Sequence, residues 1–521
     1  MRHRNNLIVT LNSFQGPFKN RHTARWMLKQ VQHDEKGGSD LVLTMRAFLA
    51  CSAFLLLSAC STNPTSGRPM FSAVSSGQEA SMGAGEHPKI MAQMGGVNDT
   101  QELNFMVARI GARLAPHAER QDVNWTFTVL NDEMVNAFAV PGGYIYVTRG
   151  LLALAQDESQ VAGVIAHEMG HVNARHSAQQ MSQGLLAQVG LQVLGIATGS
   201  NVATQMGGIG ADLYMKGYSR AHEFEADALG VKYLAAAGYD PYAAAKFLQQ
   251  LQRSTELDAR IAGKPAGSEM SGYFSTHPQT PERVARAKAL ADALPKNPDA
   301  EMGRTAYLNA IKGTIYGGDA KGGFVRGNEF IHPGLKIRFR APDGFRIQNT
   351  NKAVIASNNS GAIAIFDTAK AATDDAGGFI SNVWAPNANL GNQERITVNG
   401  RAGATASGSL NTSDGAKDAQ LVALSAGPGQ FYRLLFLAPQ GQMGRYAESF
   451  RRSTYSFEHD ESIASVSPNR IRVVTARAGD TVQSLAGRMQ VTDSPLERFC
   501  LINGLSPDSR INTGDQVKIV E

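Results

Sequence analysis

Two histidines four residues apart, inside an apolar helical segment, constrain the fold of this chain more than any other feature. The helix is predicted to begin near Asp157, and a buried stripe of helical period follows it: Val161, Val164, Ile165, Met169 and Val172. His167 and His171 are one turn apart, so both imidazoles project from one face and can bind the same ion. Glu168 lies beside them and can take a proton from a water molecule.

A hydrolytic zinc site needs three protein ligands and one open position for water. A second predicted helix over residues 219–235 supplies carboxylates for the third ligand, because it holds Glu223 and Glu225. Helical spacing alone does not decide between these two, and His222 is a further competitor. Asp227, one turn after Glu223, can accept the spare ring N–H of a ligand histidine and fix its tautomer.

The chain resembles the M48 peptidases, which are zinc metallopeptidases of the gluzincin type. Five segments within about residues 80–295 carry the resemblance: Asn136 to Gly143, Arg149 to Leu152, His167 to His171, Glu223 to Asp227, and Ser275 to Pro278. It implies a mostly α-helical, zincin-type metallopeptidase domain with a small β-sheet, over residues 81–296, that cleaves proteins in the cell envelope.

The resemblance also implies the roles of individual residues. One Zn²⁺ is held by His167, His171 and Glu223, because the third ligand in this family is the Glu four residues before the Asp. Glu168 is then the general base, and Asp227 orients a ligand histidine.

Two further segments have alternative roles. His277 is predicted in a loop from which it can reach the open zinc position, blocking it or steadying an oxyanion; otherwise it shapes the turn into the next helix. Asn136, Ala137 and Phe138 belong either to a strand edge that pairs with substrate, as the resemblance suggests, or to ordinary sheet core.

The N-terminal part is typical of a secreted protein. Residues 45–59 contain a basic start and an apolar run, as in a signal peptide, and they end at Cys60 in a Leu-Ser-Ala-Cys sequence that resembles a bacterial lipobox. Lipid on Cys60 would hold the protein on a membrane, which we expect to be the outer membrane, facing the periplasm. A plain signal peptide with an incidental cysteine is the alternative. We exclude residues 1–44 from the mature protein, and interpret residues 60–80 as a tether.

Charge and cysteine content exclude two classes of protein. Residues 1–59 hold eight Lys or Arg and three Asp or Glu, which accounts for the whole formal charge of +5. The remainder is balanced, so charge gives no argument for nucleic acid as a partner. Of the three cysteines, Cys51 lies in the signal peptide and Cys60 is the predicted lipid site, so Cys500 has no partner for a disulfide.

Other elements follow from periodicity and turn residues. The predicted helices cover residues 103–114, 242–254 and 281–294, with a helix pair over 185–206, and the predicted strands cover 125–130 and 144–148. An α+β domain is predicted over residues 325–457, and a linker over 462–468. Residues 470–521 read as strand, helix, helix and strand, and resemble a LysM domain, a small module that binds peptidoglycan glycan. The alternative is a packing module that has lost sugar binding.

Together these features predict a zinc-dependent endopeptidase of the bacterial envelope that cleaves unfolded or misassembled envelope proteins. A non-catalytic, peptidoglycan-binding lipoprotein scaffold that assists outer-membrane protein assembly is the alternative, although a scaffold has no need to keep Glu168. A peptidoglycan hydrolase is disfavoured, because cell-wall metallopeptidases use other zinc spacings.

Overall fold

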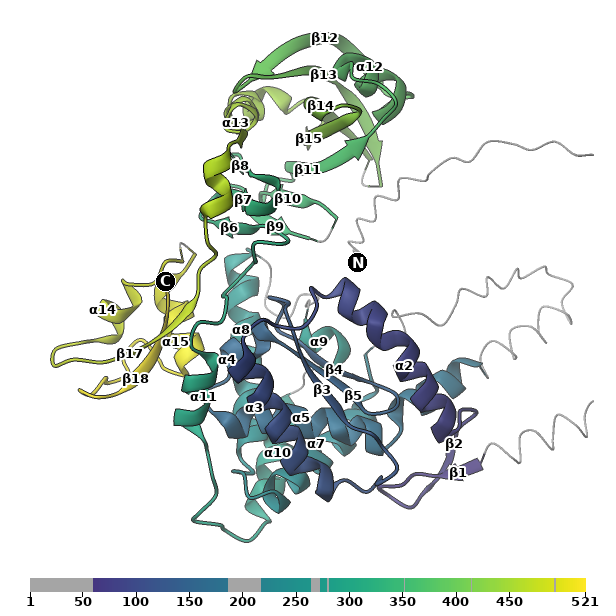
Figure 1. The fold of residues 1–521 in the computed structure, drawn as a ribbon, viewed down its shortest axis with the longest axis vertical. Helices are drawn as coiled ribbons and strands as arrows, with labels where there is room; N and C mark the ends of the chain where they lie inside the picture. Colours follow the sequence, from purple (N-terminus) through teal and green to yellow (C-terminus); the bar gives the residue numbers. More distant parts are fainter. Residues whose placement is uncertain are drawn as a thin grey trace, which may run out of the picture.

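The computed structural model describes residues 60–185, 217–263, 272–278, 281–350, 352–413, 415–491 and 493–521. The predictions for residues 1–59, and nearly all of the helix pair predicted over 185–206, lie outside these ranges. Within the described ranges, no helix has the length and apolar character needed to cross a membrane. Figure 1 shows a mainly helical part with a small sheet, a β-rich part above it and a small C-terminal part beside it.

The helical part surrounds a three-stranded sheet. Its strands are β3 (Thr126–Leu130), β4 (Ala137–Val140) and β5 (Tyr144–Thr148). The order is β3-β5-β4, with β3 parallel and β4 antiparallel to β5, so the Pro-Gly-Gly bend at 141–143 joins β4 to β5. The helices are α2 (Ser76–Gln93), α3 (Gln101–Leu114), α4 (Arg149–Leu154), α5 (Glu158–Asn173), α7 (Arg220–Ala236), α8 (Ala243–Ile261), α9 (Tyr273–Thr276), α10 (Pro281–Asp292) and α11 (Arg304–Ile311).

Helix α5 is the centre of this part, and all its residues are buried. Asp157 caps it, accepting a hydrogen bond from the Gln160 amide at 2.9 Å. A Cβ added at Gly170 would lie 3.1 Å from the Ala226 Cα atom on α7. Small residues therefore let α5 and α7 approach closely, which brings Glu223 of α7 beside the histidines of α5.

Residues 60–80 are folded, whereas the sequence predicts a tether. Strands β1 (Cys60–Thr62) and β2 (Pro69–Phe71) form an antiparallel hairpin, and α2 begins soon after it with a capping box at Ser75. The side chains of Asn63 and Thr65 hydrogen-bond the Glu225 carboxylate of α7. The prediction was wrong because these polar side chains bind a distant carboxylate rather than water.

The β-rich part contains two sheets. Strands β6 (Phe324–Arg326), β7 (Glu329–His332), β8 (Ile337–Arg340) and β16 (Glu458–His459) form one, in the order β16-β8-β7-β6. The other has the order β12-β13-β14-β15-β11-β10-β9, with strands β9 (Arg346–Asn349), β10 (Val354–Ser357), β11 (Ile363–Lys370), β12 (Asn389–Val398), β13 (Arg401–Thr412), β14 (Gly415–Gly427) and β15 (Gln430–Pro439).

Two helices, α12 (Ala376–Phe379) and α13 (Met443–Tyr455), cover opposite faces of the larger sheet. Leu421 belongs to the hydrophobic cluster that contains Phe379 of α12, and Val422 belongs to the one that contains Phe450 of α13. Neighbouring residues of a strand point to opposite faces, so the two helices lie on different sides. The α+β character predicted for residues 325–457 is present, and the strand β16 extends this part to His459.

The C-terminal part has the predicted order of elements: β17 (Ile471–Thr475), α14 (Val482–Ala486), α15 (Pro495–Asn503) and β18 (Gln516–Val520). It packs directly on the helical part, with α15 against α4 and α8 and β17 against α11 (Figure 1). Ile471 and Leu501 belong to the largest core cluster of the helical part. The buried side-chain nitrogen of Lys518 donates hydrogen bonds to the carbonyls of Ala153 and Ala155.

Candidate metal centre

Four potential ligands meet in the interior of the helical part. His167 and His171 come from α5, Glu223 comes from the first turn of α7, and His277 directly follows α9. One ligand atom from each lies within 4.8 Å of the other three, and all four residues are buried. The structure thus brings together the three predicted ligands and His277.

The spacing of these atoms suits a single zinc ion. Ligand atoms bound tetrahedrally at about 2.0–2.2 Å lie about 3.3–3.6 Å from each other. His167 Nε2 is 3.0 Å from His171 Nε2 and 3.5 Å from Glu223 Oε2, and His171 Nε2 is 3.6 Å from Glu223 Oε1. Two imidazoles and one carboxylate are also a usual zinc donor set, so the residues fit the ion.

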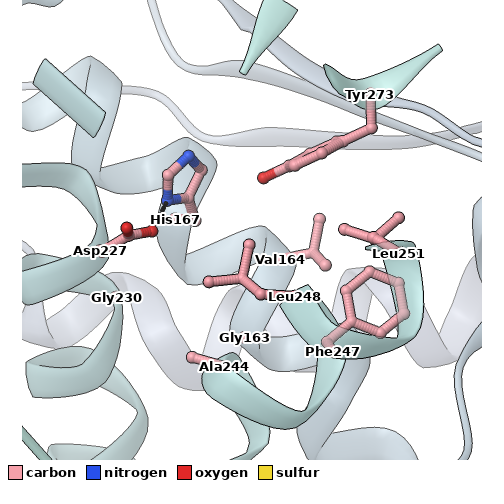
Figure 2. Close-up of a pocket in the computed structure, with 10 residues that line it drawn as sticks. All are labelled: Gly163, Val164, His167, Asp227, Gly230, Ala244, Phe247, Leu248, Leu251 and Tyr273. Carbon is pink, nitrogen blue, oxygen red and sulfur yellow. Dashed lines mark ion pairs between the residues drawn. The ribbon is translucent and has the colours of Figure 1, made fainter. Parts of the chain in front are cut away.

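Asp227 lies behind His167, as Figure 2 shows, with Oδ1 3.0 Å from His167 Nδ1. This contact assigns the ring proton to Nδ1 and leaves Nε2 facing the other ligands. Burial alone would raise the pKa of Asp227, but hydrogen bonds from Arg283 and His167 outweigh it and lower that pKa. Asp227 is therefore a carboxylate that fixes the tautomer of His167.

Arg283 of α10 belongs to the site, although the sequence did not predict it there. Its guanidinium lies 2.7 Å from Asp227 Oδ1 and 2.6 Å from Glu223 Oε2, and the side chain is 1% exposed. Burial would raise the pKa of Glu223, but His277, His167 and Arg283 hold it well below its usual value. No local pattern marks Arg283, because its partners are on another helix about sixty residues earlier.

Glu168 lies next to the ligand cluster with a carboxylate that is available for chemistry. It is 0% exposed, and neither of its oxygens has a hydrogen-bond partner among the described residues. Burial raises its pKa, against the opposing charges of His277 and His167. A buried carboxylate of raised pKa can take up a proton during reaction and release it again.

His277 contacts two of the proposed zinc ligands and also Glu168. Nδ1 is 3.1 Å from Glu223 Oε1 and 3.3 Å from His167 Nε2, while Nε2 is 3.4 Å from Glu168 Oε1. Its ring stacks on Tyr273, with ring centroids 4.4 Å apart. His277 thus occupies the side of the cluster from which a fourth donor would approach.

The pocket in Figure 2 lies beside His167, is lined mainly by residues of α5, α7 and α8, and is not a substrate cleft. Its volume is about 20 Å³, roughly that of one water molecule, and apolar side chains of α5 and α8 form most of its lining. Figure 2 also shows Tyr273 with its hydroxyl directed toward His167. The pocket is a small packing void behind the candidate ligand.

The other two candidate ligands on α7 lie away from the cluster. His222 stacks on His176, with ring centroids 4.2 Å apart, and Glu225 Oε2 is 3.3 Å from His176 Nε2. His176 was not among the predicted site residues, although it follows His171 by only five residues. A third histidine so close to the motif was the available signal.

The remaining predicted residues lie at two places. Asn136 precedes β4, whose residues Ala137 and Phe138 are buried, and β4 forms one edge of its sheet. Asn136 is also buried, and its side-chain amide has no hydrogen-bond partner among the described residues. Cys60 is the first residue of β1.

Comparison with known proteins finds a family match over part of the chain. Residues 102–291 match Peptidase family M48. The mitochondrial metalloendopeptidase OMA1 of Arabidopsis thaliana is 33% identical over 36% of this chain and 36% of its own length. The putative beta-barrel assembly-enhancing protease of Vibrio cholerae is 32% identical over 37% of this chain and 40% of its own length. The beta-barrel assembly-enhancing protease of Escherichia coli (strain K12) is 30% identical over 45% of this chain and 48% of its own length. The chain thus spans less than half the length of each of these relatives.

Proposed function

We propose that the chain is a zinc-dependent endopeptidase of the bacterial envelope, because residues 102–291 match Peptidase family M48. The observation that carries this proposal is the convergence of His167, His171 and Glu223 beside Glu168, whose carboxylate accepts no hydrogen bond from the described residues. A zinc ion fits these three residues, and Glu168 lies where a base is needed.

Each residue has a separate role in the proposed reaction. His167, His171 and Glu223 hold one Zn²⁺, which when bound supplies a Lewis acid that activates water and polarises the peptide carbonyl. Glu168 accepts the proton of the attacking water and passes it to the leaving amine. Asp227 keeps His167 in the tautomer that presents Nε2 to the ion.

His277 and β4 complete the proposed site. The two ring nitrogens of His277 face the carboxylates of Glu223 and Glu168. An oxyanion donor would instead point at the position that the substrate oxygen occupies. The contacts therefore support a gate, a side chain that must move before substrate binds. Ala137 and Phe138 belong to the edge strand β4, and Asn136 directly precedes it, so we propose that an extended substrate adds here as a further strand.

The proposed setting is the periplasmic face of the outer membrane. The lipobox-like sequence at Cys60 supports lipid attachment, and two relatives are named as beta-barrel assembly-enhancing proteases. Because Cys60 is in the folded hairpin, its lipid would hold the peptidase domain close to the bilayer. The proposed substrates are unfolded or misassembled envelope proteins.

Casein hydrolysis by the purified full chain tests the proposed activity. The wild type should bind one zinc and cleave casein, a chelator should abolish cleavage, and Glu168→Gln should keep zinc but lose cleavage. Wild-type protein that binds one zinc yet cleaves no more than Glu168→Gln would refute the proposal. Glu223→Ala should lower zinc affinity far more than Glu225→Ala, and the reverse result would reject the ligand assignment.

We also propose that residues 470–521 bind peptidoglycan glycan. Deleting them is a poor test, because Ile471, Leu501 and Lys518 pack into the peptidase domain. The full chain should instead sediment with purified sacculi, and soluble oligomers of N-acetylglucosamine should displace it. Sedimentation that these oligomers leave unchanged would contradict glycan binding.

A further inference from the structure

A chain of polar contacts leads from the candidate ligand His171 away from the metal centre. His171 Nδ1 is 2.8 Å from His176 Nδ1, and His176 Nε2 is 3.3 Å from Glu225 Oε2. Glu225 accepts from His176 Nε2–H, so His176 Nδ1 is the acceptor for His171 Nδ1–H. This arrangement leaves His171 Nε2 without a proton, in the form that binds a metal ion.

The other oxygen of Glu225 is held by the hairpin at residues 60–71. Asn63 Nδ2 lies 3.1 Å and Thr65 Oγ1 2.6 Å from Glu225 Oε1. Asn63 Oδ1 accepts the backbone amides of Thr65 and Ser66 at 2.8 and 3.2 Å, so the amide nitrogen of Asn63 must face Glu225. Two side chains of the hairpin loop thus fix the orientation of this carboxylate.

A second contact ties the same N-terminal segment to the chain between the two histidines. Arg175 has a left-handed backbone, with φ of 57°, where α5 has just ended. Its guanidinium pairs with buried Glu79 of α2 at 3.1 Å and donates to the Val74 carbonyl at 2.5 Å. These contacts stabilise a turn that a residue with a Cβ adopts rarely, and the turn directs His176 back toward His171.

We propose that residues 60–79 are a positioning element of the metal centre. Asn63 and Thr65 orient Glu225, Glu225 orients His176, and His176 fixes the ring and the tautomer of His171. Glu79 and Val74 support the turn from which His176 projects. The inference rests on the proposed zinc site, and it makes zinc affinity depend on the segment that directly follows the proposed lipid attachment residue, Cys60.

The test compares zinc affinity with the stability of the metal-free protein, using purified full-length chain. The double variant Asn63→Ala/Thr65→Val removes both donors to Glu225, while Ser66→Ala, in the same loop with an exposed side chain, is the matched control. Thr65→Ser keeps the hydroxyl. Zinc dissociation constants come from competition with a chromophoric chelator, and Co²⁺ absorption spectra report the ligand geometry.

Loss of an outer partner of a metal ligand typically costs about 10–100-fold in metal affinity. We expect about tenfold weaker zinc binding and a changed Co²⁺ spectrum for the double variant. Asn63→Ala also removes the acceptor of the Thr65 and Ser66 amides, so the melting temperature of the metal-free protein should fall as well. Ser66→Ala and Thr65→Ser should behave as the wild type. His176→Phe, which keeps the aromatic packing, should weaken zinc binding at least as much as the double variant.

Wild-type affinity in the double variant and in His176→Phe would overturn the inference. If the metal-free double variant melts early, Glu225→Gln decides, because it keeps the shape of the side chain but replaces one acceptor oxygen with an NH2 donor, so the side chain can no longer accept from both His176 and the hairpin. Wild-type zinc affinity there would again overturn the inference. Failure of the wild type to bind zinc is a different result, which rejects the proposed function itself.

Discussion

Arg283 Nη1 lies 2.6 Å from Glu223 Oε2, so a guanidinium neutralises the carboxylate that we propose as the third zinc ligand. The same guanidinium makes two hydrogen bonds to Asp227, at 2.8 and 2.7 Å. The buried guanidinium of Arg283 thus pairs with both Glu223 and Asp227. This pairing lets two acidic groups lie in the protein interior before any metal ion arrives.

Replacing Arg283 should therefore harm the metal-free protein most. Arg283→Met leaves two buried carboxylates without their cation, and removing one partner of such a pair costs about 3–5 kcal/mol. Zinc restores part of the missing positive charge. We expect a larger loss of melting temperature in chelator than in zinc, measured by thermal unfolding under both conditions. Lys288→Met, at an exposed position of the same helix, should change neither value, and equal losses under both conditions would contradict this role.

The close approach of α5 and α7 gives a second prediction. In Gly170→Ala the new Cβ would lie 3.1 Å from both Cα and O of Ala226, so the backbone of α7 must shift and carry Glu223 with it. Overpacking of this kind costs about 1–3 kcal/mol, and zinc affinity should fall as well. Urea unfolding and zinc titration measure the two effects. Gly85→Ala, in α2 with open space around the new Cβ, should be neutral or slightly stabilising.

Local spacing was enough to predict the parts of the site that lie on one helix. The positions of His167, Glu168 and His171 follow from one helical turn, and the strand, helix, helix and strand order at the C-terminus follows from periodicity and turn residues. Glu223 needed more than spacing, because Glu225 is equally placed in the sequence, and only the resemblance to M48 peptidases favoured it.

Contacts between distant elements were not predictable in this way. Arg283 and Lys518 have no neighbouring sequence signal, since their partners are brought near only by tertiary packing. Composition also misled the interpretation of residues 60–80, because Asn63 and Thr65 look the same in a solvated tether and in a loop that binds a buried carboxylate.

The position of His277 predicts a gain of activity on its removal. If His277 covers the open side of the metal centre, His277→Ala should raise kcat/KM for casein. The factor equals the ratio of covered to uncovered metal centres in the wild type. Zinc affinity should fall, because a fourth donor is lost. An oxyanion donor would behave oppositely, since its loss lowers kcat about 10²–10³-fold. Initial rates at saturating zinc distinguish the two, and a large fall in kcat would reject the gate.

The buried Lys518 predicts that the C-terminal part stabilises the peptidase domain. Its side-chain nitrogen donates to the Ala153 and Ala155 carbonyls and, at 2.8 Å, to the Tyr307 hydroxyl. Lys518→Met fills the same space but leaves these acceptors unpaired, so the free energy of unfolding should fall by at least about 2 kcal/mol. Lys312→Met, at an exposed position after α11, is the control and should have little effect in urea unfolding.

The cost of Lys518→Met should also depend on pH. Burial lowers the pKa of Lys518 well below its usual value, so the unfolded chain binds a proton that the folded chain lacks in the range between the two pKa values. The free energy of unfolding of the wild type therefore rises with pH up to about 10, the pKa of a solvated lysine. Met does not titrate, so the difference between wild type and variant should widen from about pH 7 to about pH 10. Urea unfolding at both ends of this range measures it, and a difference that stays constant would mean that Lys518 keeps the same protonation state in both forms of the chain.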